Sequence, residues 1–137
     1  MKKDFANLAV WHVFQRVATP WVVWGLYVGA QWIWHTPGAY DAALRSELLH
    51  VLEHLAFFGA ALLFWWHVTG AAQRIYGRLS YGFRIIYALA AMAQNEVLGV
   101  VIAFAKAPLY AYYPTVPRLW GISVLDDQAL GGAIMWV

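Results

Sequence analysis

Two histidines and a glutamate stand close together in a stretch that is otherwise almost wholly apolar. They are His50, Glu53 and His54, and the surrounding residues 48–69 are rich in Leu, Phe, Ala and Trp. On a helix, positions i and i+4 project from one face about 6 Å apart along the axis, which suits two ligands of one metal ion. The spacing therefore predicts a metal site. Glu53 would be a ligand, a proton carrier, an acceptor that orients an imidazole, or simply an interfacial carboxylate.

The composition indicates that these groups lie in a membrane protein. Hydrophobic residues make up 63% of the 137-residue chain and charged residues 12%, with a formal net charge of +2. Such a balance is typical of a polytopic membrane protein, for which no nucleic-acid partner is expected. The chain has no cysteine, which excludes disulfides and thiolate metal sites. A metal must then be held by His, carboxylate, Met, amide or backbone groups.

The apolar runs predict an all-α transmembrane bundle that forms one domain over residues 1–137. Three runs approach the ~20 residues needed to cross the hydrocarbon core: residues 17–34, 48–69 and 85–105. A fourth helix should start at 126 with an acidic cap and is too short to cross. Residues 5–15 read as an interfacial amphipathic segment rather than a cleavable signal, and residues 38–47 as a short connection.

Charge placement predicts which side of the inner (cytoplasmic) membrane holds the histidines. Residues 70–83 contain arginines and no acidic residue, and the N-terminus carries Lys2 and Lys3. The positive-inside rule places both on the cytoplasmic side. His50 and His54 then lie on the periplasmic or extracytoplasmic side. The short link from the first span puts His35 on the same side, so we expect the three imidazoles to gather at the outer rim of the bilayer.

Other polar and small residues suggest contacts between helices. The triplet Gln94, Asn95 and Glu96 interrupts the third span, so at least one of its side chains must face protein or water. For Asn95 and Glu96, hydrogen bonding between helices is favoured over metal ligation. Gly25 and Gly29 form a GxxxG pair, which predicts a close-packing face. His12 and His67 are interpreted as surface or interface histidines without a site.

The cluster leaves several kinds of chemistry open. Imidazole suits copper, zinc, iron and nickel about equally, so spacing does not identify the metal. Haem could be held by His54 together with His35 or a histidine of another chain. The pattern HxxEH is also that of an inverted zincin, in which Glu53 is the general base and Glu96 or Asp127 would have to supply the third zinc ligand. A purely structural helical subunit is the remaining alternative.

Several motifs taken in order resemble the multi-spanning CtaG family, membrane proteins associated with cytochrome c oxidase assembly. The matching segments are Trp34-His35-Thr36-Pro37, Tyr40-Asp41-Ala42-Ala43-Leu44, His50-Val51-Leu52-Glu53-His54, Pro108-Leu109-Tyr110 and Asp127-Gln128-Ala129-Leu130-Gly131-Gly132. The resemblance runs from about Trp34 to the end of the chain.

The resemblance implies a non-catalytic role in oxidase maturation, through copper on the outer side of the membrane. By motif position it implies that His35, His50, His54, Asp127 and Gln128 are functional. Implied partners are respiratory oxidase subunits or other membrane chains, and a homo-oligomer is possible. The chain corresponds to the C-terminal half of typical members, so we expect the site to need a partner or a second copy if the other half supplies ligands.

Overall fold

The computed structural model describes residues 12–15, 18–71, 79–118 and 121–136, and all the regular structure within those ranges is helical. This confirms the all-α prediction for the described part of the chain. The helices are α2 (Pro20–Trp34), α3 (Pro37–Arg45), α4 (Glu47–Val68), α6 (Tyr81–Ala103) and α7 (Val124–Trp136), with a single 3₁₀ turn, η1 (Tyr113–Thr115).

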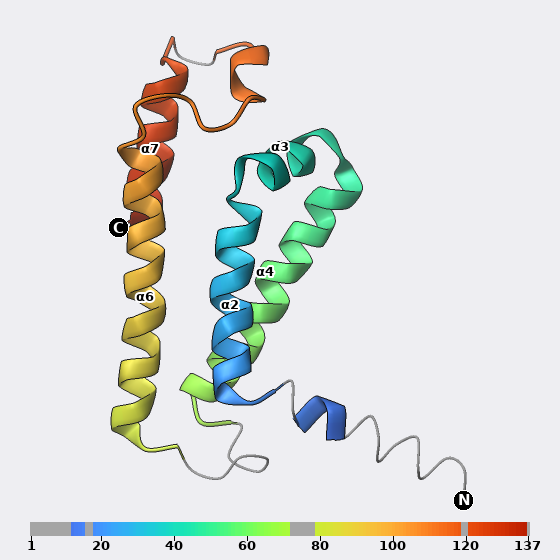
Figure 1. Ribbon diagram of the computed structural model, residues 1–137, viewed down its shortest axis with the longest axis vertical. Coiled ribbons are helices and arrows are strands. Elements are labelled where there is room, and N and C mark those ends of the chain that lie inside the picture. Colours follow the sequence, from blue (N-terminus) through green and yellow to red (C-terminus); the bar gives the residue numbers. More distant parts are fainter. Residues whose placement is uncertain (1–11, 16–17, 72–78, 119–120, 137) are drawn as a thin grey trace, which may run out of the picture.

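The helices form two antiparallel pairs that diverge toward one end of the molecule. Figure 1 shows α2 beside α4, with α3 joining them across one end, and α6 beside α7 in the second pair. The segment between α6 and α7 lies at the same end as α3. The α3 end therefore brings together residues that are far apart in the sequence. Most of the motifs that resemble the CtaG family lie in the segments at this end.

Local sequence explains where the helices begin. Pro37 cannot continue α2, but at the first position of a helix its missing N–H costs nothing, so the residue that ends α2 also begins α3. Ser46 caps α4 by accepting a hydrogen bond from the N–H of Leu49 at 3.5 Å. The sequence reading of residues 38–47 as a plain connection was wrong, because α3 occupies most of it.

Two of the helices are long and apolar enough to cross a membrane, by length and composition. These are α4, with 22 residues, and α6, with 23. Helix α2 has 15 residues, which rise about 22 Å and fall short of the ~30 Å hydrocarbon core. Within the described residues the structure thus supports two of the three predicted full spans. The third predicted span begins earlier than expected, at Tyr81. The predicted interfacial segment lies mostly outside the described residues, of which 12–15 are helical.

A small core at the other end of the molecule holds the two pairs together. It contains Val23, Phe64, Tyr87 and Ala91 from α2, α4 and α6. Beside it, His67 is only 1% exposed, and its Nε2 lies 2.8 Å from the carbonyl oxygen of Ala18. Of the two alternatives given for His67, surface or interface, the surface one is therefore wrong. Its ring ties the start of α2 to the end of α4, a contact that hydropathy alone does not reveal.

The closest helix crossing joins α6 to α7 at two glycines. A Cβ on Gly132 would lie 2.4 Å from the backbone nitrogen of Ala103 and 2.8 Å from the carbonyl oxygen of Gly99. A Cβ on Gly25 or Gly29 would meet nothing within 4 Å, so the predicted GxxxG face is not a close contact here. The small residues that let the backbones approach are instead Gly99 in α6 and Gly132 in the last motif of the chain.

We expect Gly132→Ala to destabilise the α6–α7 pair by about 1–3 kcal/mol, because backbone atoms must move to admit the methyl group. Gly131→Ala is the matched control, since a Cβ there meets nothing within 4 Å. Thermal unfolding of the detergent-solubilised protein measures both. Equal stability of the two variants would contradict the close contact between α6 and α7 at Gly132.

Candidate functional site

The structure brings His50, Glu53 and His54 together in the first turns of α4. One potential ligand atom from each residue lies within 4.8 Å of the other two, and the two imidazole centroids are 4.5 Å apart. Both histidines are exposed, whereas Glu53 is 8% exposed. The imidazoles of the cluster are therefore reachable from outside, whereas Glu53 is mostly covered by neighbouring residues. We call these three residues the α4 cluster.

Hydrogen bonding fixes which ring nitrogen His54 can offer to a metal. Its Nδ1 lies 3.0 Å from the carbonyl oxygen of His50. Because a carbonyl only accepts, Nδ1 carries the proton and Nε2 keeps its lone pair. Metal-ligating histidines usually make such a bond through the nitrogen that does not bind the metal. His35 is arranged in the same way, with Nδ1 at 2.6 Å from the carbonyl oxygen of Gln31.

Glu53 is the least expected feature of the α4 cluster. Its side chain is buried, and it accepts no hydrogen bond from any residue that the structure describes. The residue is mostly covered, but its carboxylate oxygens are not fully enclosed, so they remain available to a cation. The two imidazoles are too close to leave the carboxylate isolated, so the arrangement is suited to a shared cation.

His35, Asp127 and Gln128 do not belong to the α4 cluster. They line a separate cleft of 540 Å³, whereas His50 and His54 line an open groove with Val51, Leu55 and Phe58. Other side chains that line the cleft are Gln31, Tyr40, Asn95, Tyr110, Tyr113 and Met135. The predicted site residues are thus divided between two places at the same end of the molecule.

Three tyrosines that sequence reasoning did not single out form one side of this cleft. Tyr40 stacks on Tyr110 with centroids 4.0 Å apart, and its hydroxyl oxygen is 2.9 Å from that of Tyr113. Tyr110 donates a hydrogen bond to the carbonyl oxygen of His35 at 3.2 Å. Tyr40 and Tyr110 both lie within motifs that resemble the CtaG family. That resemblance was the only feature of the sequence that pointed to a role for these two tyrosines.

Burial favours the neutral form of Tyr40 and of Tyr110 by raising the pKa of each hydroxyl. Burial, followed by the charges of Tyr113 and Asp41, raises the pKa of Tyr110 to about 12. Burial, followed by the hydrogen bond with Tyr113, raises the pKa of Tyr40 well above its ordinary value. Both hydroxyls therefore remain neutral hydrogen-bond donors near neutral pH.

Gln128 holds the segment that follows α6. Its Oε1 accepts a hydrogen bond from the N–H of Leu109 at 2.6 Å, and its Nε2 donates to the carbonyl oxygens of Ile102 and Ala107 at 3.3 and 3.5 Å. On the other side, Asp41 accepts hydrogen bonds from the N–H groups of Ala111 and Tyr112 at 2.9 and 3.0 Å. Residues 109–112 are therefore held from α7 and from α3.

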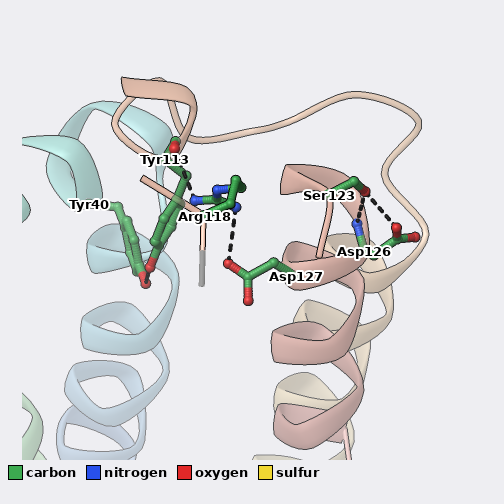
Figure 2. A network of polar contacts seen from close by, with 6 residues as sticks. All are labelled: Tyr40, Tyr113, Arg118, Ser123, Asp126 and Asp127. Atoms are coloured by element: carbon green, nitrogen blue, oxygen red, sulfur yellow. Dashed lines mark hydrogen bonds and ion pairs between the residues drawn. The ribbon is translucent and has the colours of Figure 1, made fainter. Parts of the chain in front are cut away.

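Asp127 makes an ion pair rather than a helix cap. Figure 2 shows its carboxylate facing Arg118, with an N–O distance of 3.5 Å, while Arg118 also donates to the carbonyl oxygen of Tyr113 at 3.0 Å. The cap of α7 is Ser123, whose Oγ accepts from the N–H of Asp126 at 3.1 Å and donates to its carboxylate at 2.6 Å. The sequence predicted an acidic cap at 126, and Asp126 does take part in the cap, although Ser123 is the capping residue.

Comparison with protein families agrees with the motifs. A model of the cytochrome c oxidase caa3 assembly factor family (Caa3_CtaG) matches residues 4–137. The chain belongs to this family. The match begins well before Trp34, so the family pattern covers nearly the whole sequence and not only the segments that carry the motifs. The family description names an assembly role and no reaction.

The curated relatives that this chain matches are much longer than it. Uncharacterized proteins of Mycobacterium bovis and Mycobacterium tuberculosis are each 28% identical to it over 131 residues, which is 92% of this chain and 20% of theirs. An uncharacterized protein of Mycobacterium leprae is 28% identical over 112 residues, 81% of this chain and 17% of its own. The chain thus spans about a fifth of the length of these relatives. No solved structure matches it significantly.

The hydrogen bonds of Gln128 predict that replacing this residue will loosen the segment after α6. Gln128→Leu removes the acceptor of the Leu109 N–H, so we expect a loss of about 1–3 kcal/mol and faster amide hydrogen exchange over residues 105–112. Asp127→Asn, which weakens only a partly exposed ion pair, should change stability by less than about 1 kcal/mol. Unchanged exchange in Gln128→Leu would show that the amide does not hold this segment.

Proposed function

We propose that this protein is a membrane-embedded, non-catalytic factor in respiratory oxidase assembly that carries copper as its cargo. The α4 cluster is the proposed cargo site, with His50, Glu53 and His54 as the ligands. The observation that carries the proposal is that one possible ligand atom from each of these three residues lies within 4.8 Å of the other two, and that Glu53 accepts no hydrogen bond from the described residues.

The donor set suits a transferable ion. Two imidazoles and one carboxylate leave at least one coordination position for a ligand from a recipient, so the ion can pass on by ligand exchange. The exposure of His50 and His54 gives the recipient access to it. Imidazole binds copper and zinc alike, and copper is preferred because the family assists the assembly of a cytochrome c oxidase and the resemblance implies copper.

The proposed orientation places the α4 cluster at the outer face of the inner membrane. The cluster lies near the start of α4, and the arginine-rich residues 70–83 follow the end of that helix. If α4 spans the bilayer, the positive-inside rule puts its end in the cytoplasm and its start outside. The proposed partners are therefore the lipid bilayer and an oxidase subunit that approaches from the outer side.

His35, Asp127 and Gln128 are assigned a different role from that of the α4 cluster. They line the cleft, Asp127 is paired with Arg118, and Gln128 makes three backbone contacts. We place them outside the proposed ligand set. Gln128 instead holds the end of α6 and the segment after it, and Tyr110 in that segment bonds the carbonyl oxygen of His35 at the end of α2.

No specific observation favours the enzymatic or haem alternatives. An inverted zincin would need a third ligand from a later helix, but neither Glu96 nor Asp127 belongs to the α4 cluster found among the described residues. A haem held by His54 and His35 would have to reach both the open groove and the separate cleft.

Copper binding tests the proposal directly. Purified protein loaded with Cu(I) in an anaerobic buffer should retain about one ion per chain, measured by elemental analysis. His50→Ala, His54→Ala and Glu53→Gln should each weaken affinity by about 10- to 100-fold or more, because each removes one donor. His35→Ala is the control and should retain the ion.

Some results would contradict the copper proposal. These are wild-type protein that retains no copper, or loss of copper in His35→Ala with no change in His50→Ala. An optical spectrum of the same sample separates the alternatives, since a Soret band would indicate haem. Peptide cleavage that needs zinc and disappears in Glu53→Gln would indicate a protease.

A further inference from the structure

Three consecutive polar residues in the apolar helix α6 face different directions. Successive residues on a helix are rotated by about 100°, so Gln94, Asn95 and Glu96 together cover most of the circumference. Gln94 accepts a hydrogen bond from Trp32 of α2 at 2.8 Å, and Asn95 donates one to the carbonyl oxygen of Met135 of α7 at 3.2 Å. Two of the three directions are therefore occupied by helices of this chain.

Glu96 faces the third direction. It is exposed, and it makes no hydrogen bond or ion pair with any residue that the structure describes. It lies about 10 Å from the end of α6, at 1.5 Å per residue, which is inside the ~30 Å hydrocarbon core if α6 spans the membrane. A carboxylate at such a depth is costly when it faces lipid, so it normally faces protein or a water-filled cavity.

An apolar strip on α6 continues from Glu96 toward the other end of the helix. Met92, Leu89 and Ile85 precede Glu96 at intervals of four, three and four residues, which places them on one face, and each is more than half exposed. This spacing is that of a helix–helix seam. We call these four residues the Glu96 stripe: three apolar contacts with one charged group.

We infer that the Glu96 stripe is a docking surface for a transmembrane helix of a partner subunit, which presents a cationic or amide donor to Glu96 within the membrane. This inference rests on the membrane placement of α6 in the proposed function, and it is independent of copper. Charge identifies the occupant: a second copy docked symmetrically through the same stripe would place one carboxylate against another, and lipid chains offer no donor.

Site-directed photocrosslinking in the membranes of the source organism tests the inference. The photoreactive residue benzoylphenylalanine replaces Met92 on the stripe or, as a matched control, Val101, which is 51% exposed but five residues from Glu96 and thus on another face. The Met92 probe should form an adduct with a membrane-spanning peptide that contains Arg, Lys, His, Asn or Gln, as identified by mass spectrometry. The Val101 probe should not.

Variants at Glu96 decide whether the carboxylate directs the contact. Glu96→Leu should lower the adduct yield about 3- to 20-fold, the usual range for one polar contact between membrane helices. Glu96→Gln, which still accepts a hydrogen bond, should retain most of the yield. Adducts with lipid alone, adducts between two copies of this chain, or a yield unchanged by Glu96→Leu would overturn the inference.

Failure of this inference and failure of the proposed function give different results. Cu(I) retention should be the same in Glu96→Leu as in the wild type, because Glu96 is not part of the α4 cluster. Resistance of the protein to alkaline extraction from membranes reports the insertion on which both proposals depend. Normal insertion and copper retention without a stripe adduct would reject the docking surface alone.

Discussion

A polar side chain among apolar helices must find its partner in protein, because lipid and packed side chains provide none. This constraint accounts for several of the long-range hydrogen bonds among the described residues. His67 bonds the carbonyl oxygen of Ala18, Gln94 accepts from Trp32, and Gln128 bonds the segment after α6. Each of these contacts joins segments that are distant in the sequence. Two carboxylates, Glu53 and Glu96, have no such contact with the described residues, and they carry the two proposals.

The sequence was sufficient to predict the helical class and the closeness of the three side chains in the α4 cluster. Apolar runs of membrane length and the i, i+4 spacing of His50 and His54 depend only on local geometry, and the structure contains both features. Helix α3 was missed because Pro37 reads as a helix terminator, although it is equally suited to a first helical position. Whether the cluster binds copper remains a prediction.

Long-range contacts could not be predicted in the same way. Periodicity does not say which helix Gly132 approaches or which loop Gln128 bonds, because both depend on how the pairs cross. The expectation that His35 joins His50 and His54 followed from their shared end of the bundle, which the structure supports. Being at the same end was not enough, because His35 lines the cleft and the other two line the groove.

His50 and His54 lie on an exposed side of α4, which affects how a bound ion would be exchanged with another molecule. An ion held there could be taken up or released while α2, α4, α6 and α7 keep their packing, since no helix has to move aside to reach the imidazoles. The time an ion stays bound would then be governed by the coordination bonds and by the approaching molecule. The scaffold itself could remain rigid throughout the transfer.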